Sequence, residues 1–304
     1  MDLIELLKAI LFGVVEGITE WLPVSSTGHM LLLEEFLKLD VSPEFWDMFL
    51  VVIQLGAILA VCVLFFRPLN PFSPSKGPEG RRATWLLWAK IVVACVPAAV
   101  VGIAFDDLMS AYLGSPFIIA AALIVYGVAF IVIENRREAR ARELAAPAAP
   151  RRAAHLAAPG PSASAAELAD AEARVTDLDE LPWGTALGIG AFQVLSLVPG
   201  TSRSGSTIIG GMLVGTSRTV ATEFSFFMSI PIMFGASLLK LVKFGFGFTA
   251  YEACILLFGM VVAFFVSILA IKFLVSYVSK NDFKIFGYYR IVLGVIVLAY
   301  FFLS

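Results

Sequence analysis

Two stretches of this chain place charged and hydroxyl side chains inside sequence that is otherwise almost wholly apolar. Residues 16–29 read EGITEWLPVSSTGH, and residues 193–207 read QVLSLVPGTSRSGST. An ionisable group at membrane depth costs about 2.5–3.5 kcal/mol on an insertion scale, so a functional role is the default interpretation for such a group. The carboxylates, hydroxyls, imidazole and guanidinium in these stretches are suited to phosphate chemistry.

The composition identifies the class of protein. Of the 304 residues, 59% are hydrophobic and 15% are charged, whereas a soluble domain has about 25% charged residues. Apolar runs of about 20 residues match the hydrocarbon thickness of a bilayer. Charge-free windows of this kind cover residues 48–66, 108–133, 181–202 and 253–271. The sequence therefore predicts an all-α polytopic membrane protein.

A segment of different composition divides the chain. Residues 136–180 are rich in Ala, Pro, Arg and Glu, and such a segment buries too little apolar surface to fold alone. We predict a flexible cytoplasmic linker with some helix near its ends. The chain is then a single membrane domain, residues 1–304, with repeat halves at 1–135 and 183–304.

The two halves share an ordered set of matches, which predicts an internal repeat. Ser26 follows Pro23 by three positions, and Ser202 follows Pro199 by the same offset. A Glu-Phe pair at 44–45 precedes a Gly-Ala pair at 56–57, and another at 223–224 precedes Gly-Ala at 235–236.

Basic residues and broken apolar stretches predict the topology. Loops rich in Arg and Lys follow the spans 47–66 and 117–135, and the positive-inside rule places them in the cytoplasm. The stretches 3–38 and 183–215 are interrupted at Pro23 and Pro199. We expect six transmembrane helices and two re-entrant helical hairpins of opposite topology, whose broken helices meet near the midplane.

The first hairpin carries a carboxylate pair and a hydroxyl cluster. Glu16 and Glu20 are spaced i,i+4, so they share one helix face and can hold a divalent cation or supply a general base. Pro23 ends the first helix, and Ser25, Ser26 and Thr27 then begin a second helix whose N-terminus can bind an anion. His29 follows and is the only histidine outside the linker, so it is a candidate for proton transfer or hydroxyl activation.

The second hairpin has the features of a phosphate-binding loop. Arg203 supplies a planar bidentate donor for phosphoryl oxygens, and the glycines beside it permit close backbone approach. We interpret the polar residues around it as substrate-binding. They are the hydroxyl residues Ser202, Ser204 and Thr207, with Gln54 and Gln193 as further polar groups inside the membrane.

These motifs resemble the signatures of the bacterial undecaprenyl-diphosphate phosphatase, or bacitracin-resistance, family. The resemblance rests on E-x-x-x-E at 16–20, PVSSTGH at 23–29 and PGTSRSGST at 199–207, and extends to FLVVIQLGA at 49–57 and EFSF at 223–226. It implies hydrolysis of the C55 isoprenoid diphosphate to the monophosphate, recycling of the carrier lipid for the cell wall, and dependence on a divalent cation. It also implies that five positions take part in activity: Glu16, Glu20, Ser26, His29 and Arg203.

The mechanism that we predict joins both hairpins. Arg203 and a Mg²⁺ or Ca²⁺ held by Glu16 and Glu20 neutralise the transferring phosphoryl group. Ser26 is the nucleophile, with His29 or a glutamate taking its proton, and attack by an activated water is the alternative.

The implied partners are a polyprenyl diphosphate and the membrane lipids, with no nucleic acid, and a homodimer stays open. We expect a multi-pass protein of the bacterial inner membrane whose site opens to the outer face. The competing interpretation is a transporter or flippase of a phosphorylated polyprenyl lipid, because inverted repeats with broken helices are common in transporters.

Overall fold

The computed structural model describes residues 3–145, 164–245 and 247–303, and the side chains of 106–111 and 145 are not described. The described residues are helical apart from turns and one isolated bridge between Val175 and Thr216. The helices are α1 (Leu3–Thr19), α2 (Ser26–Phe36), α3 (Pro43–Val52), α4 (Gln54–Leu64), α5 (Phe66–Leu69), α6 (Pro78–Leu113), α7 (Pro116–Ala145), α8 (Ala165–Ala171), α9 (Trp183–Gln193), the 3₁₀ helix η2 (Val194–Leu197), α10 (Arg203–Val214), α11 (Arg218–Phe244), α12 (Ala250–Val278) and α13 (Lys284–Leu303).

Six helical segments of the described chain are long and apolar enough to cross a membrane. They are Pro43–Leu64, Pro78–Phe105, Pro116–Leu144, Arg218–Phe244, Ala250–Val278 and Lys284–Leu303. Large apolar side chains on them face outward, for example Ile103 at 78% exposed. The prediction of an all-α polytopic membrane protein with six spans is confirmed.

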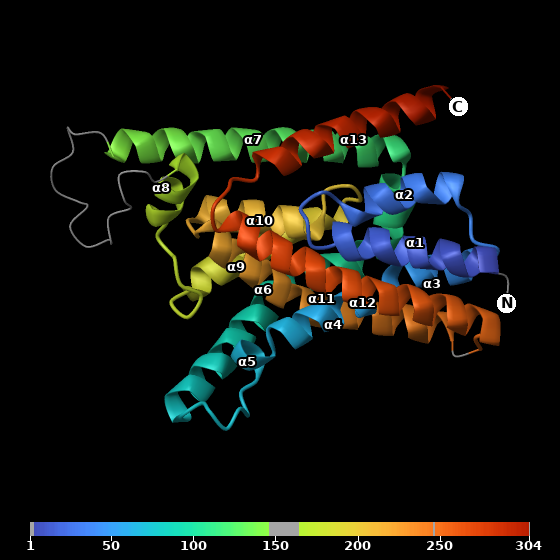
Figure 1. Ribbon diagram of the computed structural model, residues 1–304, viewed down its shortest axis with the longest axis horizontal. Helices are drawn as coiled ribbons and strands as arrows, with labels where there is room; N and C mark the ends of the chain where they lie inside the picture. Colours follow the sequence, from blue (N-terminus) through green and yellow to red (C-terminus); the bar gives the residue numbers. More distant parts are fainter. Residues whose placement is uncertain (1–2, 146–163, 246, 304) are drawn as a thin grey trace.

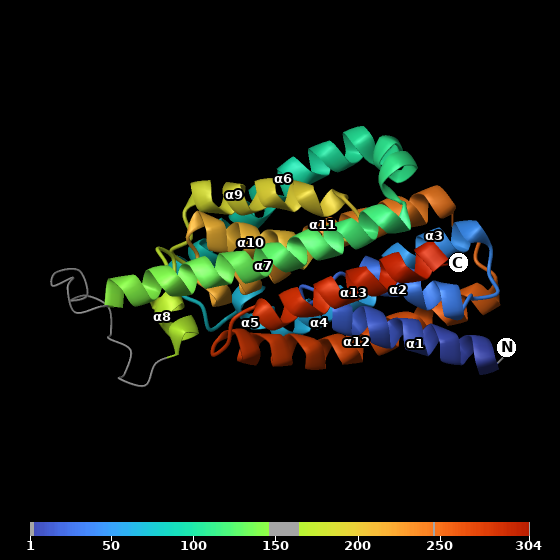
Figure 2. The same ribbon diagram turned by 90° about the horizontal axis from the view of Figure 1, so that it is seen from above.

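The remaining apolar helices form two pairs that enter the molecule from opposite ends. The α1–α2 pair begins and ends beside the N-terminus, whereas α9, η2 and α10 begin and end near α8 (Figures 1 and 2). The two turns meet in the middle of the molecule, because α10 carries residues that bond to the turn after α1. That each pair dips into a bilayer and returns to its own side stays a prediction.

Each short helix packs on a long helix from the other half of the chain. Gly13 of α1 lies against α12, and a Cβ at this position would be 2.6 Å from the carbonyl oxygen of Gly259. Gly190 of α9 lies against α6, where a Cβ would be 2.1 Å from the carbonyl oxygen of Ala94. Only glycine permits such close backbone approach. The halves therefore exchange their first helices.

Aromatic packing surrounds the meeting point of the two turns. Trp21 is fully buried in the turn after α1 and packs edge-on against Phe226 of α11, with ring centroids 5.2 Å apart. Phe65 at the end of α4 contacts both Phe226 and Phe227. This core fixes the turn that carries the first polar motif.

Within the predicted linker, residues 136–145 continue α7 and residues 165–171 form α8, whereas residues 172–180 are irregular and residues 146–163 lie outside the described residues. α8 begins with a capping box, in which Ser164 accepts from the Glu167 backbone N–H and Glu167 accepts from that of Ser164. Asp170 then pairs with Arg218 at the start of α11, at 3.1 Å. Arg218 is buried and forms a two-point ion pair with Glu134 of α7. The expected helix near both ends of the linker is confirmed.

Candidate active site

An ion pair joins the two hairpins at their tips. Arg203, the first residue of α10, donates through Nη2 to Glu20 Oε1 at 3.0 Å, and the two side chains are 10% and 6% exposed. The Arg203 guanidinium also lies 5.9 Å from the centre of the Trp21 ring. A buried ion pair needs further hydrogen bonds to offset its desolvation. Arg203 Nη1 supplies one by donating to the Ser225 carbonyl at 2.9 Å.

The same glutamate binds the predicted nucleophile. The Ser26 hydroxyl donates to Glu20 Oε2 at 2.8 Å, so each carboxylate oxygen of Glu20 has its own partner. A carboxylate within hydrogen-bond reach of a hydroxyl is placed to accept its proton. Of the two candidates for this role, Glu20 therefore has the required geometry.

His29 is held away from the Ser26 hydroxyl by two other partners. Its Nδ1 donates to the Ser25 carbonyl at 2.7 Å, and its Nε2 accepts from the Tyr289 hydroxyl at 2.7 Å. A carbonyl oxygen can only accept, so the Ser25 contact places the ring proton of neutral His29 on Nδ1. Sequence reasoning missed Tyr289, which lies 260 positions away along the chain.

Both hairpins begin their second helix in the same unusual way. Ser25 and Ser202 are the non-glycine residues of the described chain with positive φ, at 73° and 70°. Each caps the helix that follows, accepting from the backbone N–H of Gly28 at 3.4 Å and of Gly205 at 3.2 Å, respectively. Left-handed serines are strained and persist where the surroundings fix them, often at functional sites.

This geometry corrects the residue pairing expected between the halves. The equal spacing from Pro23 and Pro199 paired Ser26 with Ser202, but the structure matches Ser25 with Ser202, because both cap a helix with positive φ. Ser26 then corresponds to Arg203, since each follows its cap residue. The hydroxyl and the guanidinium thus occupy equivalent places at the two helix N-termini and converge on Glu20.

Several predicted substrate-binding hydroxyls are used within the fold. Ser204 is buried and donates to the Glu20 carbonyl at 3.2 Å, which ties α10 to the turn after α1. Buried Thr207 shares a 2.7 Å hydrogen bond with the Ser225 hydroxyl. Ser202 bonds to Ser204 at 3.1 Å, in addition to its capping role. Thr27 is exposed on α2 beside Ser26.

The two glutamines differ in their surroundings. Gln193 ends α9, is 1% exposed, and has no hydrogen-bond partner for either side-chain amide atom among the described residues. It lies nine positions before its cap residue, as Glu16 does before Ser25. Gln54 is half-buried at the start of α4 and makes no side-chain hydrogen bond within the described part of the chain.

A second arginine that sequence reasoning missed holds the two turns together. Arg290 of α13 is fully buried and donates to three backbone carbonyls: Pro23 at 3.1 Å, Gly200 at 2.8 Å and Thr201 at 2.9 Å. It has no carboxylate partner among the described residues. The sequence signal that could have identified Arg290 is a lone arginine inside an apolar span, since such a charge marks a functional position.

The carboxylate pair fits a divalent cation in its chemistry. Glu16 is 1% exposed, contacts Glu20, and has one carboxyl oxygen, Oε1, without a hydrogen-bond partner. No group of three or more His, Cys, Asp or Glu side chains within the described ranges could hold a metal. Magnesium commonly takes one or two carboxylates and completes its shell with substrate phosphates and water, so two carboxylates suffice beside a diphosphate.

Known proteins resemble this chain over nearly its whole length. Residues 9–296 match a family model described as bacitracin resistance protein BacA. A protein named undecaprenyl-diphosphatase from Desulfitobacterium hafniense is 51% identical over 99% of this chain and 98% of its own length. A protein of the same name from Enterococcus faecalis is 50% identical over 98% of this chain and 98% of its own length. Another, from Lachnoclostridium phytofermentans, is 52% identical over 100% of both. The chain therefore belongs to the bacitracin resistance protein BacA family.

Proposed function

We infer that this protein hydrolyses undecaprenyl diphosphate to undecaprenyl phosphate and inorganic phosphate. The structural observation that supports this most directly is the convergence on Glu20 of a hydroxyl, Ser26, and a guanidinium, Arg203. The relatives of similar length carry the name undecaprenyl-diphosphatase. The product is the carrier lipid for cell-wall synthesis, and its regeneration accounts for bacitracin resistance in this family.

Ser26 is the proposed nucleophile and Glu20 its base. The Ser26 oxygen bonds to the terminal phosphorus, its proton passes to Glu20 Oε2, and the bridging P–O bond breaks to release undecaprenyl phosphate. Water then attacks the phosphoserine and releases inorganic phosphate. The alternative is a single step in which Glu20 activates water for direct attack.

Arg203 supplies the positive charge for the transferred group. Its guanidinium is fixed by the Ser225 carbonyl and by Glu20, so it needs no reorganisation as negative charge develops on the phosphoryl oxygens. When bound beside Glu16 and Glu20, a Mg²⁺ or Ca²⁺ supplies further charge neutralisation. His29 keeps its position through Tyr289 and the Ser25 carbonyl, and we assign it to orient the turn that carries Ser26.

We propose that the site works in the bacterial inner membrane and opens to its outer face. The basic loops lie toward the end of the molecule that holds α5 and α8, opposite the N-terminus (Figures 1 and 2). If these loops are cytoplasmic, the α1–α2 hairpin opens outward. The prenyl tail then lies between the spans, and assembly as a homodimer is compatible with this arrangement.

Phosphate release from purified protein in detergent tests the function. Arg203→Ala should lower turnover at least ~100-fold, as expected for the loss of an electrostatic donor to the transition state. Arg142→Ala is the matched control, because Arg142 is 68% exposed at the far end of α7. Near wild-type release by Arg203→Ala would show that the site is misassigned.

A quenched-turnover experiment separates the two nucleophiles. Phosphate trapped on Ser26, absent in Ser26→Ala, supports attack by serine, and its absence during rapid turnover supports attack by water. A transporter or flippase is the second candidate function, favoured by the two hairpins that enter from opposite ends (Figure 1). Lipid movement without phosphate release would favour it over hydrolysis.

A further inference from the structure

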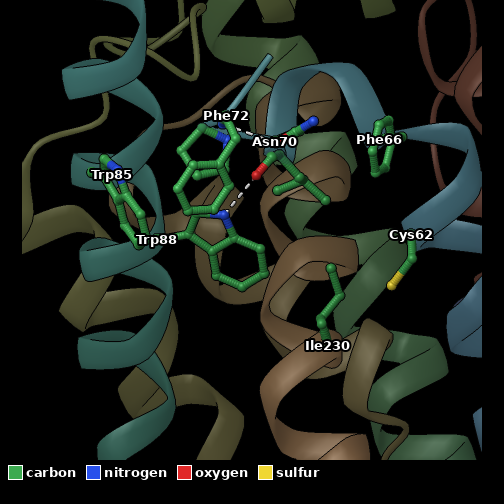
Figure 3. A pocket seen from close by; sticks show the side chains of 9 residues that line it. Cys62, Phe66, Asn70, Phe72, Trp85, Trp88 and Ile230 are labelled. Atoms are coloured by element: carbon green, nitrogen blue, oxygen red, sulfur yellow. Dashed lines mark hydrogen bonds between the residues drawn. The ribbon is translucent and has the colours of Figure 1, made fainter.

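An aromatic groove lies at the end of the molecule that carries α5, and it shares no lining residue with the candidate active site (Figure 1). It is formed by α4, α5, the loop after α5, α6 and α11, and its cavity volume is about 460 Å³. Figure 3 shows Trp85 and Trp88 on one side of the groove and Phe66 on the other, with Phe72 and Asn70 between them and Cys62 and Ile230 lower in the view. Its lining is almost entirely apolar.

The walls of the groove are fixed by hydrogen bonds and ring packing. Trp88 donates through its indole N–H to the Leu69 carbonyl at 2.8 Å, which anchors α6 to the end of α5. Phe72 packs edge-on against Trp85, with ring centroids 5.8 Å apart. Lys76 closes the loop by donating to the Pro68 carbonyl at 2.8 Å and to Thr84 at 2.6 Å. The groove is therefore preformed, and its outer rings remain exposed.

The elements that line the groove also carry three exposed arginines. Arg67 lies between Phe66 and Pro68 in α5 and is exposed. Arg81 and Arg82 are exposed in the first turns of α6, four and three positions before Trp85, so the helix period places them above this ring. Positive charge thus lies on the same elements as an apolar groove.

We propose that this groove binds an anionic phospholipid of the bilayer, with an acyl chain between Phe66 and Trp88 and the phosphate at Arg67, Arg81 and Arg82. Charge complementarity identifies the occupant, because an anionic headgroup is attracted by about 1 kcal/mol for each nearby Lys or Arg. Tryptophan side chains such as Trp85 and Trp88 are enriched at the boundary between lipid headgroups and acyl chains. The site is separate from the catalytic one and does not depend on the assigned reaction.

Quenching of tryptophan fluorescence by brominated lipid tests the proposal on the purified full-length protein. Phosphatidylglycerol with brominated acyl chains should quench at about tenfold lower concentration than the matching phosphatidylcholine. Replacing Trp85 and Trp88 by Phe should remove the quenching that depends on phosphatidylglycerol, whereas Trp183→Phe at the start of α9 should leave this quenching in place.

The triple variant Arg67→Gln, Arg81→Gln, Arg82→Gln tests the role of the charges. It should abolish the preference for phosphatidylglycerol and leave phosphate release unchanged, while Lys240→Gln with Lys243→Gln at the opposite end of the molecule should preserve the preference. Equal quenching by the two lipids in the wild type would overturn the proposal. So would protection of Trp85 and Trp88 by a second copy of the chain, detected as a cross-linked dimer.

Discussion

The Ser26 hydroxyl and the Glu20 carboxylate form a 2.8 Å hydrogen bond across the break between α1 and α2. Because the other oxygen of Glu20 is occupied by Arg203, one carboxylate positions both the nucleophile and the cation that we assign to phosphoryl transfer. Replacing Glu20 should therefore affect the chemical step more than substrate binding.

Glu20→Gln should lower kcat by about 10²–10⁴-fold, the usual contribution of a general base. The amide keeps the size of the side chain but cannot accept the Ser26 proton. Phosphate release measured over a range of substrate concentrations gives kcat and KM separately. Glu35→Gln on α2, where the side chain is half-buried, is the control, and an unchanged kcat in Glu20→Gln would remove Glu20 from the mechanism.

Arg203→Lys should lower kcat by at least about tenfold although the charge is kept. The ammonium group cannot bind the Glu20 carboxylate and the Ser225 carbonyl at once in the geometry of the guanidinium fork. The same phosphate-release assay measures the effect. Activity equal to that of the wild type would mean that charge alone suffices at this position.

Arg290→Met should destabilise the protein by about 3–5 kcal/mol, because it leaves buried polar groups without partners. The three carbonyls that lose a donor belong to both turns, so activity should fall together with the melting temperature. Lys272→Met, which removes an exposed charge from α12, is the control in thermal unfolding. An Arg290→Met protein with wild-type melting would show that the turns hold together without this side chain.

Gly190→Val should prevent normal packing of α9 on α6. A Cβ at Gly190 would meet the Ala94 backbone at 2.1 Å, and backbone atoms cannot move aside cheaply. Gly184→Val in the same helix has nothing within 4 Å of its Cβ and is the matched control. Size-exclusion yield and thermal unfolding compare the two variants, and equal behaviour would contradict the close approach of these helices.

Acid should loosen α8. Hydrogen bonds from Ser164 hold the pKa of Glu167 below the ordinary value of 4.5, so the capping box contributes its stability above pH 4.5. That contribution disappears as the pH falls through the lowered pKa of Glu167. Hydrogen exchange across Ala165–Ala171 should speed up in that range, and Glu167→Gln should show the faster exchange already at neutral pH.

The sequence predicted the parts of this site that depend on local pattern. Proline breaks in apolar stretches located both turns, and the intramembrane charges Glu20 and Arg203 marked the residues that meet there. It misplaced the repeat by one position, because positive φ at Ser25 and Ser202 cannot be read from a run of serines and threonines.

Two partners escaped prediction for a different reason. Arg290 and Tyr289 lie in a span that is apolar on average, and their contacts with the turns are 89 to 267 positions away along the chain. Only tertiary packing brings them to the site. A single charge in an apolar span marks a functional position as strongly as the charges in the two motifs do.

The exchange of first helices between the halves has a consequence for biogenesis. Gly13 and Gly17 of α1 pack on α12, and the Gly17 carbonyl accepts from Ser267 at 3.3 Å, 250 positions later in the chain. The ribosome releases α1 long before it makes α12, so the nascent first hairpin has to keep its glutamates in a temporary environment until translation is almost complete.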